Sequence, residues 1–320
     1  MNNAPVLIGS SGDSLREAFG VALTGIANDF PAMVVLDADI AGGTGAHHFR
    51  KAYPSRFIQC GIAEQNMVAM AGGLAATGII PVVTTFAVFM LRAIEQARLS
   101  IAYADMNVKL VASHPGLDVG PDGASAQCLE DIAMFRAIPN MVVLSPCDPL
   151  EIKQATRAML EYIGPVYMRT GRSDSQRILD SGYQFEIGKG RILKEGCDLS
   201  IIGCGVTTAR ALEAAKHLES EGISARVVNM STIKPIDEAL IIKCATETGR
   251  ILTVEDHSTI GGLGSAVAEV IVQNTPVPVK ILGMKDVFGE SGESDELAAK
   301  YGLDALGIVK SVKQFMDLTK

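Results

Sequence analysis

The sequence of 320 residues is 48% apolar and 20% charged, and its formal net charge at pH 7 is −8. A chain of this length can form two domains with separate cores, and the composition is that of a globular protein rather than a disordered one. The acidic balance argues against nucleic acid as a partner, because a phosphate backbone needs a basic face.

Local patterns exclude further classes of protein. No window reaches the roughly 18 consecutive apolar residues that span a bilayer, so no membrane segment is expected. The first residues, Met1 to Pro5, lack the basic and apolar regions of a signal peptide. The six cysteines are scattered without a C-x-x-C pair, so we expect no metal-ligating residues, no disulfides and a cytoplasmic location.

Apolar β-branched runs alternate with amphipathic stretches along the chain, a pattern that predicts βαβ units around parallel sheets. In the first half, the predicted strands are Met33–Asp37, Val82–Thr85, Val108–Ala112, Met141–Leu144 and Val166–Arg169. The predicted helices of that half are Asp13–Asn28, Ala63–Thr77, Met90–Ala104, Ala126–Ala137 and Pro149–Tyr162.

A polar segment without hydrophobic period, Arg172–Gly182, precedes a second α/β unit. Its predicted strands are Leu199–Ile202, Ala225–Asn229, Ile251–Val254 and Val279–Leu282, and its predicted helices are Val206–Glu221, Ile236–Thr248 and Leu263–Asn274. We therefore predict an α/β fold of two consecutive domains, each a mostly parallel sheet flanked by helices. The expected boundaries are residues 1–175, a linker at 176–190, and residues 191–320.

The segment from residue 57 to 74 reads F-I-Q-C-G-I-A-E-Q-N-M-V-A-M-A-G-G-L and predicts a short strand, a turn at Gly61 and a helix that begins near Glu64. The helix is apolar almost all round, which predicts that it is buried. Burial disfavours the charged form of a carboxyl, so Glu64 is a candidate for proton exchange. A simpler alternative is that Glu64 only offers negative charge to a helix N-terminus.

The string Gly61–Met67, G-I-A-E-Q-N-M, resembles the pyrimidine-domain motif of transketolases and of the related deoxyxylulose-phosphate synthases. The resemblance covers essentially the whole chain, and it implies a pyrimidine-binding domain followed by a transketolase C-terminal domain. It also implies that Glu64 hydrogen-bonds the aminopyrimidine ring of thiamine diphosphate and so promotes loss of the thiazolium proton. A carboxyl in a dry place suits this proton transfer.

The same resemblance assigns further cofactor contacts. Phe86 and Phe89 follow a predicted strand and match aromatic residues that stack on the aminopyrimidine, although two such aromatics alone are more often core residues. Arg92 stands where some relatives have an aromatic residue, and a solvated or interface role is equally consistent with it. Asp39 ends a strand in D-A-D-I, at the sheet edge where ligands bind, and is expected beside the cofactor or substrate.

Substrate contacts are expected from a glycine-rich loop and from the strand that follows it. By resemblance, His114 and Asp122 contact the sugar, and Arg169 grips its phosphate with a planar guanidinium. The alternative for Arg169 is a salt bridge at the domain junction. Ala126 replaces a histidine that touches the donor in relatives, which leaves the donor ketose open. The later segment Val254–Gly264 resembles the signature of the family's C-terminal domain and is expected to be structural.

The diphosphate-binding motif of the family, G-D-G followed by a distant Asn, does not occur in this sequence. Pro121-Asp122-Gly123 lacks the first glycine and belongs to the substrate loop. A separate N-terminal transketolase subunit is therefore expected to hold the diphosphate and its Mg²⁺ (or Ca²⁺), in an α2β2 assembly.

These features together predict a subunit that transfers a two-carbon ketol group from a ketose phosphate to an aldose phosphate. Three alternatives are a beta subunit of a 2-oxoacid dehydrogenase, an enzyme similar to deoxyxylulose-phosphate synthase, and a non-catalytic paralogue suggested by Ala126.

Overall fold

A computed structural model describes residues 9–319, so the Met1–Pro5 segment lies outside the described residues. Its first sheet has seven strands, of which six run parallel and the edge strand β12 pairs antiparallel with β6. In sheet order the strands are β12 (Thr232–Lys234), β6 (Val142–Leu144), β7 (Val166–Thr170), β5 (Lys109–Ser113), β4 (Ile80–Phe86), β2 (Met33–Asp37) and β3 (Phe57–Gln59).

Helices cover both faces of this sheet, because successive side chains of its strands point to opposite faces. Val35 of β2 packs in the same cluster as Phe19 and Ile152, whereas the next residue, Leu36, packs in the cluster of Met67 and Phe135. The helices and short helical turns are α1 (Leu15–Gly25), α2 (Ala41–Thr44), α3 (His47–Ala52), η1 (Pro54–Arg56), α4 (Glu64–Ala75), α5 (Ala87–Met90), η2 (Leu91–Ala93), α6 (Ile94–Gln96), η3 (Ala97–Ala102), η4 (Leu117–Asp122), α7 (Asp131–Ala137) and α8 (Pro149–Glu161).

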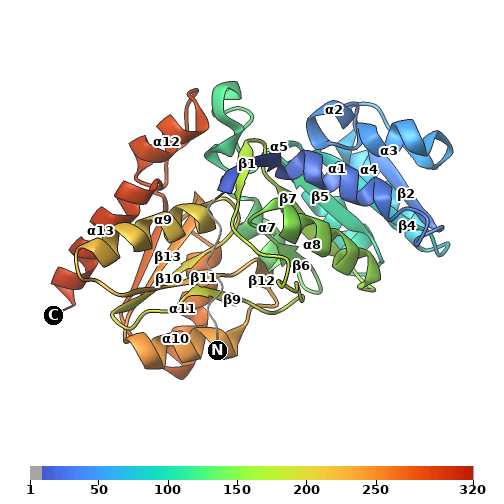
Figure 1. Cartoon of the computed structure of the whole chain (residues 1–320). Helices are drawn as coiled ribbons and strands as arrows, with labels where there is room; N and C mark the ends of the chain where they lie inside the picture. The colour runs from blue at the N-terminus through green and yellow to red at the C-terminus, as the bar shows by residue number, and fades with distance from the viewer. Residues whose placement is uncertain (1–8, 320) are drawn as a thin grey trace.

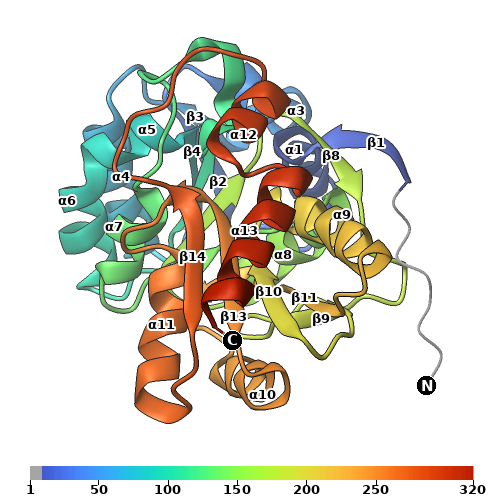
Figure 2. The same cartoon turned by 90° about the vertical axis from the view of Figure 1, so that its left-hand side faces the viewer.

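The second sheet has five strands, in the order β14 (Val279–Met284), β13 (Ile251–Ser258), β10 (Leu199–Gly203), β11 (Ala225–Asn229) and β9 (Arg191–Lys194), with only β9 antiparallel. Figure 2 shows helices α9 and α13 side by side over one face, with α10 and α11 at the lower end of the domain. The helices are α9 (Thr207–Ser220), α10 (Glu238–Thr248), α11 (Leu263–Asn274), α12 (Ser294–Tyr301) and α13 (Ala305–Leu318). The α/β fold with two mostly parallel sheets is thus confirmed.

The two domains interlock (Figure 1). Strand β12 lies in the sequence of the second domain but extends the sheet of the first, with Thr232 opposite Leu144. One apolar cluster runs from Leu36 in the first domain to Ile271 in the second. In addition, β1 (Gly9–Ser14) pairs antiparallel with β8 (Asp174–Arg177), a strand within the polar segment that precedes the second domain.

Two local predictions were wrong. Helix α4 is not buried all round: Met67, Val68 and Ala71 face the core, whereas Ala69 and Gly73 are exposed. The predicted helix Met90–Ala104 is interrupted by a 3-10 turn and ends in a π-helical turn. Within residues 9–319, no helix combines the length and the apolar character needed to cross a membrane.

Candidate functional site

The carboxyl ends of the central strands meet at one edge of the first sheet. Asp37 lies opposite Thr84, Phe86 opposite Ser113, and Ser113 opposite Thr170. Residues that follow these strands are therefore brought together, at the edge where α/β sheets bind ligands.

Glu64 is the first residue of α4, and its side chain is only 3% exposed. Its Oε2 atom is buried and has no hydrogen-bond partner in the described structure. The nearest cation is Arg92, whose Nη1 lies 3.5 Å from Oε2 while the arginine side chain is 62% exposed. A buried carboxylate oxygen without a hydrogen bond is costly, so this atom is poised to receive a donor from a ligand.

The amide of Gln59 ties the turns after β2 and β3 together. Its Oε1 accepts hydrogen bonds from the backbone N–H groups of Asp39 and Gly61, both at 3.0 Å. Asp39 has a positive φ of 64° and is exposed at the sheet edge, whereas Asp37 is buried and accepts from Ile40 N–H and the Thr84 hydroxyl. Asp39 is thus placed near the start of the Glu64 segment, and Asp37 is structural.

Three rings form a stack at the ends of β4 and β5. The ring centroid of Phe86 lies 3.6 Å from that of His114 and 5.4 Å from that of Phe89, with interplanar angles of 19° and 7°. Gly43 leaves room for this stack, because a Cβ there would lie 2.6 Å from Phe86 Cε1. Phe86 and Phe89 are half-buried, so the stack offers an apolar surface at the edge of the site.

His114 is neutral at physiological pH. Burial, together with the positive charges of Arg16 and Arg172, lowers the pKa of its imidazole from 6.5 to about 3. The Ser113 hydroxyl donates to the Gly43 carbonyl at 3.2 Å, so His114 Nδ1–H donates to Ser113 Oγ at 3.0 Å. This leaves Nε2 of His114 as an acceptor.

Arg16 and Arg172 were not singled out from the sequence. Arg16 donates through Nη1 to the Gly43 carbonyl at 3.2 Å, while its Nε is buried without a partner. Among residues 14–319, whose side chains the structure describes, the guanidinium of Arg172 has no acceptor, and both arginines act electrostatically on His114. Arg172 follows the end of β7, whereas Arg169 lies within this strand. Because ligands bind beyond the carboxyl ends of parallel strands, this position is the sequence signal that could have identified Arg172 as a site residue.

Arg169 lies in a buried salt bridge. Its Nε donates to Asp131 Oδ2 at 2.7 Å, its Nη2 donates to Asp131 Oδ1, and its Nη1 donates to the Asp256 carbonyl at 3.1 Å. The Tyr167 hydroxyl also donates to Asp131 Oδ2, at 2.5 Å. Phosphate binding by Arg169 stays a prediction, but this geometry favours the alternative of a salt bridge at the domain junction.

The glycine-rich loop is held by the second domain. The Asp256 carboxylate accepts from Leu117 N–H at 2.8 Å and from Asp118 N–H at 3.1 Å. Asp118 Oδ2 in turn accepts from Arg172 N–H at 2.7 Å. Asp122 lies exposed on this loop, and no hydrogen bond or ion pair joins its side chain to another described side chain, which are those of residues 14–319. The structure therefore does not join Asp122 to His114.

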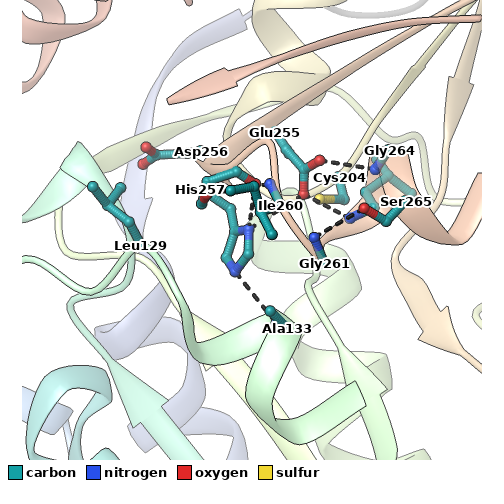
Figure 3. A network of polar contacts seen from close by, with 12 residues as sticks. Leu129, Ala133, Cys204, Glu255, Asp256, His257, Ile260, Gly261, Gly264 and Ser265 are labelled. Atoms are coloured by element: carbon teal, nitrogen blue, oxygen red, sulfur yellow. Dashed lines mark hydrogen bonds and ion pairs between the residues drawn. The ribbon is translucent and has the colours of Figure 1, made fainter. Parts of the chain in front are cut away.

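Residues next to Asp256 also pack at the domain junction (Figure 3). Glu255 accepts from Leu263 N–H at 2.6 Å and from Gly264 N–H at 2.8 Å, and burial raises its pKa to about 7. His257 accepts from Ala133 N–H at 3.3 Å, and burial, followed by the charge of Arg169, lowers its pKa to about 4. Both side chains are 0% exposed and connect elements rather than face the strand edge.

Comparisons with known proteins identify the class of this two-domain chain. The family model "Transketolase, pyrimidine binding domain" matches residues 12–177, and "Transketolase, C-terminal domain" matches residues 188–308. The chain therefore belongs to the transketolase family and contains these two domains in this order.

Its relatives include subunits of split transketolases. A 6-deoxy-6-sulfo-D-fructose transketolase subunit of Clostridium sp. is 40% identical over 301 residues, which are 94% of this chain and 94% of that protein. An apulose-4-phosphate transketolase subunit of Phocaeicola vulgatus is 39% identical over 303 residues, 94% of this chain and 97% of that protein. A solved structure, "Split gene transketolase, inactive beta4 tetramer", is 46% identical, has a TM-score of 0.88 and covers 97% of this chain and 100% of its own.

Proposed function

We propose that this chain is the catalytic-acid subunit of a split transketolase that depends on thiamine diphosphate. The observation that carries the proposal is Glu64: a buried carboxylate oxygen without a donor lies at the strand edge of a transketolase pyrimidine-binding domain. The ring nitrogen of an aminopyrimidine, once protonated, supplies the missing donor, and the half-buried side chains of Phe86 and Phe89 offer apolar contact to the ring. The residues present therefore fit the pyrimidine end of the cofactor.

When bound, thiamine diphosphate supplies the carbon nucleophile that cleaves and forms ketose bonds. The chain's own residues position the cofactor and exchange protons. Glu64 exchanges a proton with the ring nitrogen through Oε2 in a water-poor position, and Asp39 borders the same edge. Arg92 moves away from Glu64 when the ring binds, which its exposed side chain permits.

The substrate side of the site is proposed to consist of His114, Arg16 and Arg172, with Asp122 on the exposed part of the glycine-rich loop. The two arginines attract an anionic group, and their free guanidinium atoms can hydrogen-bond phosphate oxygens. Neutral His114 accepts a hydrogen bond from a substrate hydroxyl through Nε2. These residues fit a sugar phosphate better than Arg169, whose guanidinium is paired with Asp131. The reaction that we propose is transfer of a two-carbon ketol group from a ketose to an aldose.

A partner subunit is proposed to hold the diphosphate and its Mg²⁺, in an α2β2 complex. The partner's contact surface is a strip that begins beside Glu64: Ile62 is 74% exposed, and Leu99 and Tyr103 on the adjoining segment are 51% and 80% exposed. Large exposed apolar side chains of this kind mark interaction sites. The apulose-4-phosphate transketolase subunit and the β4 tetramer among the relatives are consistent with assembly through such a surface.

Reconstitution with an N-terminal transketolase subunit tests the function. Glu64→Gln should lower ketol transfer by at least about a hundredfold, because a positioned acid contributes that much or more. Glu186→Gln, which changes an exposed acid in the connection between the two domains, should leave turnover unchanged. Activity of the Glu64→Gln complex close to that of the wild type would refute the proposed role.

Calorimetry of the isolated chain tests whether cofactor binding requires the partner subunit. The chain alone should bind thiamine diphosphate with Mg²⁺ weakly, and the two-chain complex should bind them tightly. Tight binding by the isolated chain would contradict the need for a partner.

A further inference from the structure

A cluster of two imidazoles and a carboxylate lies outside the proposed active site. Glu17 is in the first turn of α1, and His47 and His48 begin α3, in the part of the first domain drawn in blue in Figure 1. Because some thirty residues separate Glu17 from the histidines, no local sequence pattern joins them. The fold of α1 against α3 brings them together.

The three side chains converge on one point. Nε2 of His48 lies 2.8 Å from Glu17 Oε2, and Nε2 of His47 lies 3.9 Å from the same oxygen. One ligand atom from each residue lies within 4.8 Å of the other two. Zn²⁺ binds imidazole and carboxylate at about 2.0–2.2 Å, so tetrahedral ligand atoms are separated by roughly 3.3 Å. The two separations from Glu17 Oε2, 2.8 and 3.9 Å, bracket this value.

A hydrogen bond between His48 and Glu17 accounts for only part of the arrangement. The His47 ring packs on the His48 ring with centroids 4.0 Å apart. Nδ1 of His47 is buried and has no hydrogen-bond partner. Among the side chains that the structure describes, in residues 14–319, His47 has no hydrogen-bond partner, and its Nε2 lies 3.9 Å from the oxygen that His48 contacts. Two imidazole nitrogens that converge on one carboxylate oxygen are compatible with a shared cation.

We propose that Glu17, His47 and His48 bind a divalent transition metal ion of the Zn²⁺ type. Imidazole ligands select zinc, nickel or copper, whereas Mg²⁺ and Ca²⁺ prefer an all-oxygen set. The three side chains are 34–37% exposed, so water can complete the coordination shell. The ion would fasten α1 to α3 and is separate from the Mg²⁺ assigned to the partner subunit. The site is independent of the proposed catalytic function.

An ion bound by Glu17, His47 and His48 would also affect the stability of the first domain. Glu17 directly follows Arg16, whose guanidinium donates to the Gly43 carbonyl in α2, the short helix before α3. An ion that joins α1 to α3 therefore restrains the two segments that meet at this contact. It should raise the melting temperature of the chain without any cofactor present.

Equilibrium dialysis of the EDTA-treated chain against Zn²⁺, with Mg²⁺ as a second probe, tests the site. One equivalent of Zn²⁺ should bind, and Mg²⁺ should not compete. His47→Gln and Glu17→Gln should each weaken Zn²⁺ binding at least tenfold and abolish the Zn²⁺-dependent rise in melting temperature. His217→Gln, which alters an exposed histidine on α9, should change neither.

Co²⁺ substitution separates this site from cysteine binding. The described chain has an exposed thiol at Cys197 and a half-buried one at Cys60. A nitrogen and oxygen ligand set gives visible d–d bands without the near-ultraviolet thiolate band. Equal Zn²⁺ binding by the wild type and a His47→Gln/His48→Gln variant, or a thiolate band that persists in that variant, would overturn the proposal. Melting curves in EDTA establish that the variants fold.

Discussion

Replacing Asp131 by asparagine removes the negative charge that balances Arg169 inside the protein. The side chains of the two residues are 0% and 6% exposed, and Tyr167 donates a further hydrogen bond to the same carboxylate. Removing one partner of a buried ion pair leaves an uncompensated charge and costs about 3–5 kcal/mol. At about 2–4 °C per kcal/mol for a chain of this size, the melting temperature should fall by at least about 6 °C.

Urea unfolding, followed by circular dichroism, measures the loss. Asp29→Asn provides the matched control, because Asp29 pairs with Arg157 and both side chains are about half exposed, which limits its cost to about 1 kcal/mol. Adding Arg169→Met to Asp131→Asn should recover part of the lost stability, since no buried charge then remains. A loss for Asp131→Asn no larger than that of the control would refute this account of Arg169.

Two further predictions concern the substrate site and the buried histidines. Arg172→Gln should lower kcat/KM for phosphorylated ketoses by roughly ten- to a hundredfold, the cost of a lost charged hydrogen bond, while Arg177→Gln on exposed β8 should have no effect in the same steady-state assay. Between pH 6.5 and 4.5, His114 and His257 lower the stability as the pH falls, because their folded pKa values are about 3 and 4 and the unfolded chain binds more protons there. Glu255 opposes them, because its folded pKa of about 7 makes the folded chain bind one more proton. One proton corresponds to roughly 1 kcal/mol per pH unit, so urea titrations should show a slope lower than that of the wild type by about this amount in His257→Gln and higher by about this amount in Glu255→Gln; a slope unchanged in both variants would contradict the assignment.

The central strands could be predicted from the sequence because buried parallel strands are continuous apolar runs bounded by turn residues. Met33–Asp37 and Ala225–Asn229 have the bounds expected. The segment from Met90 to Ala104 shows what such patterns cannot resolve. Its helical composition does not distinguish hydrogen bonds to the third, fourth or fifth residue, so the 3-10 and π-helical turns were missed.

The candidate site was predictable where a local motif carries it and not where distant residues meet. Glu64 begins the helix that follows β3, and Phe86 ends β4, close to the positions expected from their motifs. The roles of both residues stay predictions. The partner of Arg169 is Asp131, and its pairing across strands and helices leaves no trace in the local sequence. The same holds for Asp256, which reaches the glycine-rich loop from the other domain.

The position of strand β12 has consequences for folding during synthesis and for the evolution of the chain. The backbone forms the first strands of the second sheet, returns to the first sheet for Thr232–Lys234, and then goes back to the second sheet. A nascent chain therefore completes its first sheet only after much of the second domain has left the ribosome. Recombination between two genes within the polar segment Arg172–Gly182 would combine β6 of one parent with β12 of the other. Because these two strands must pair, the two domains are expected to be inherited as one unit.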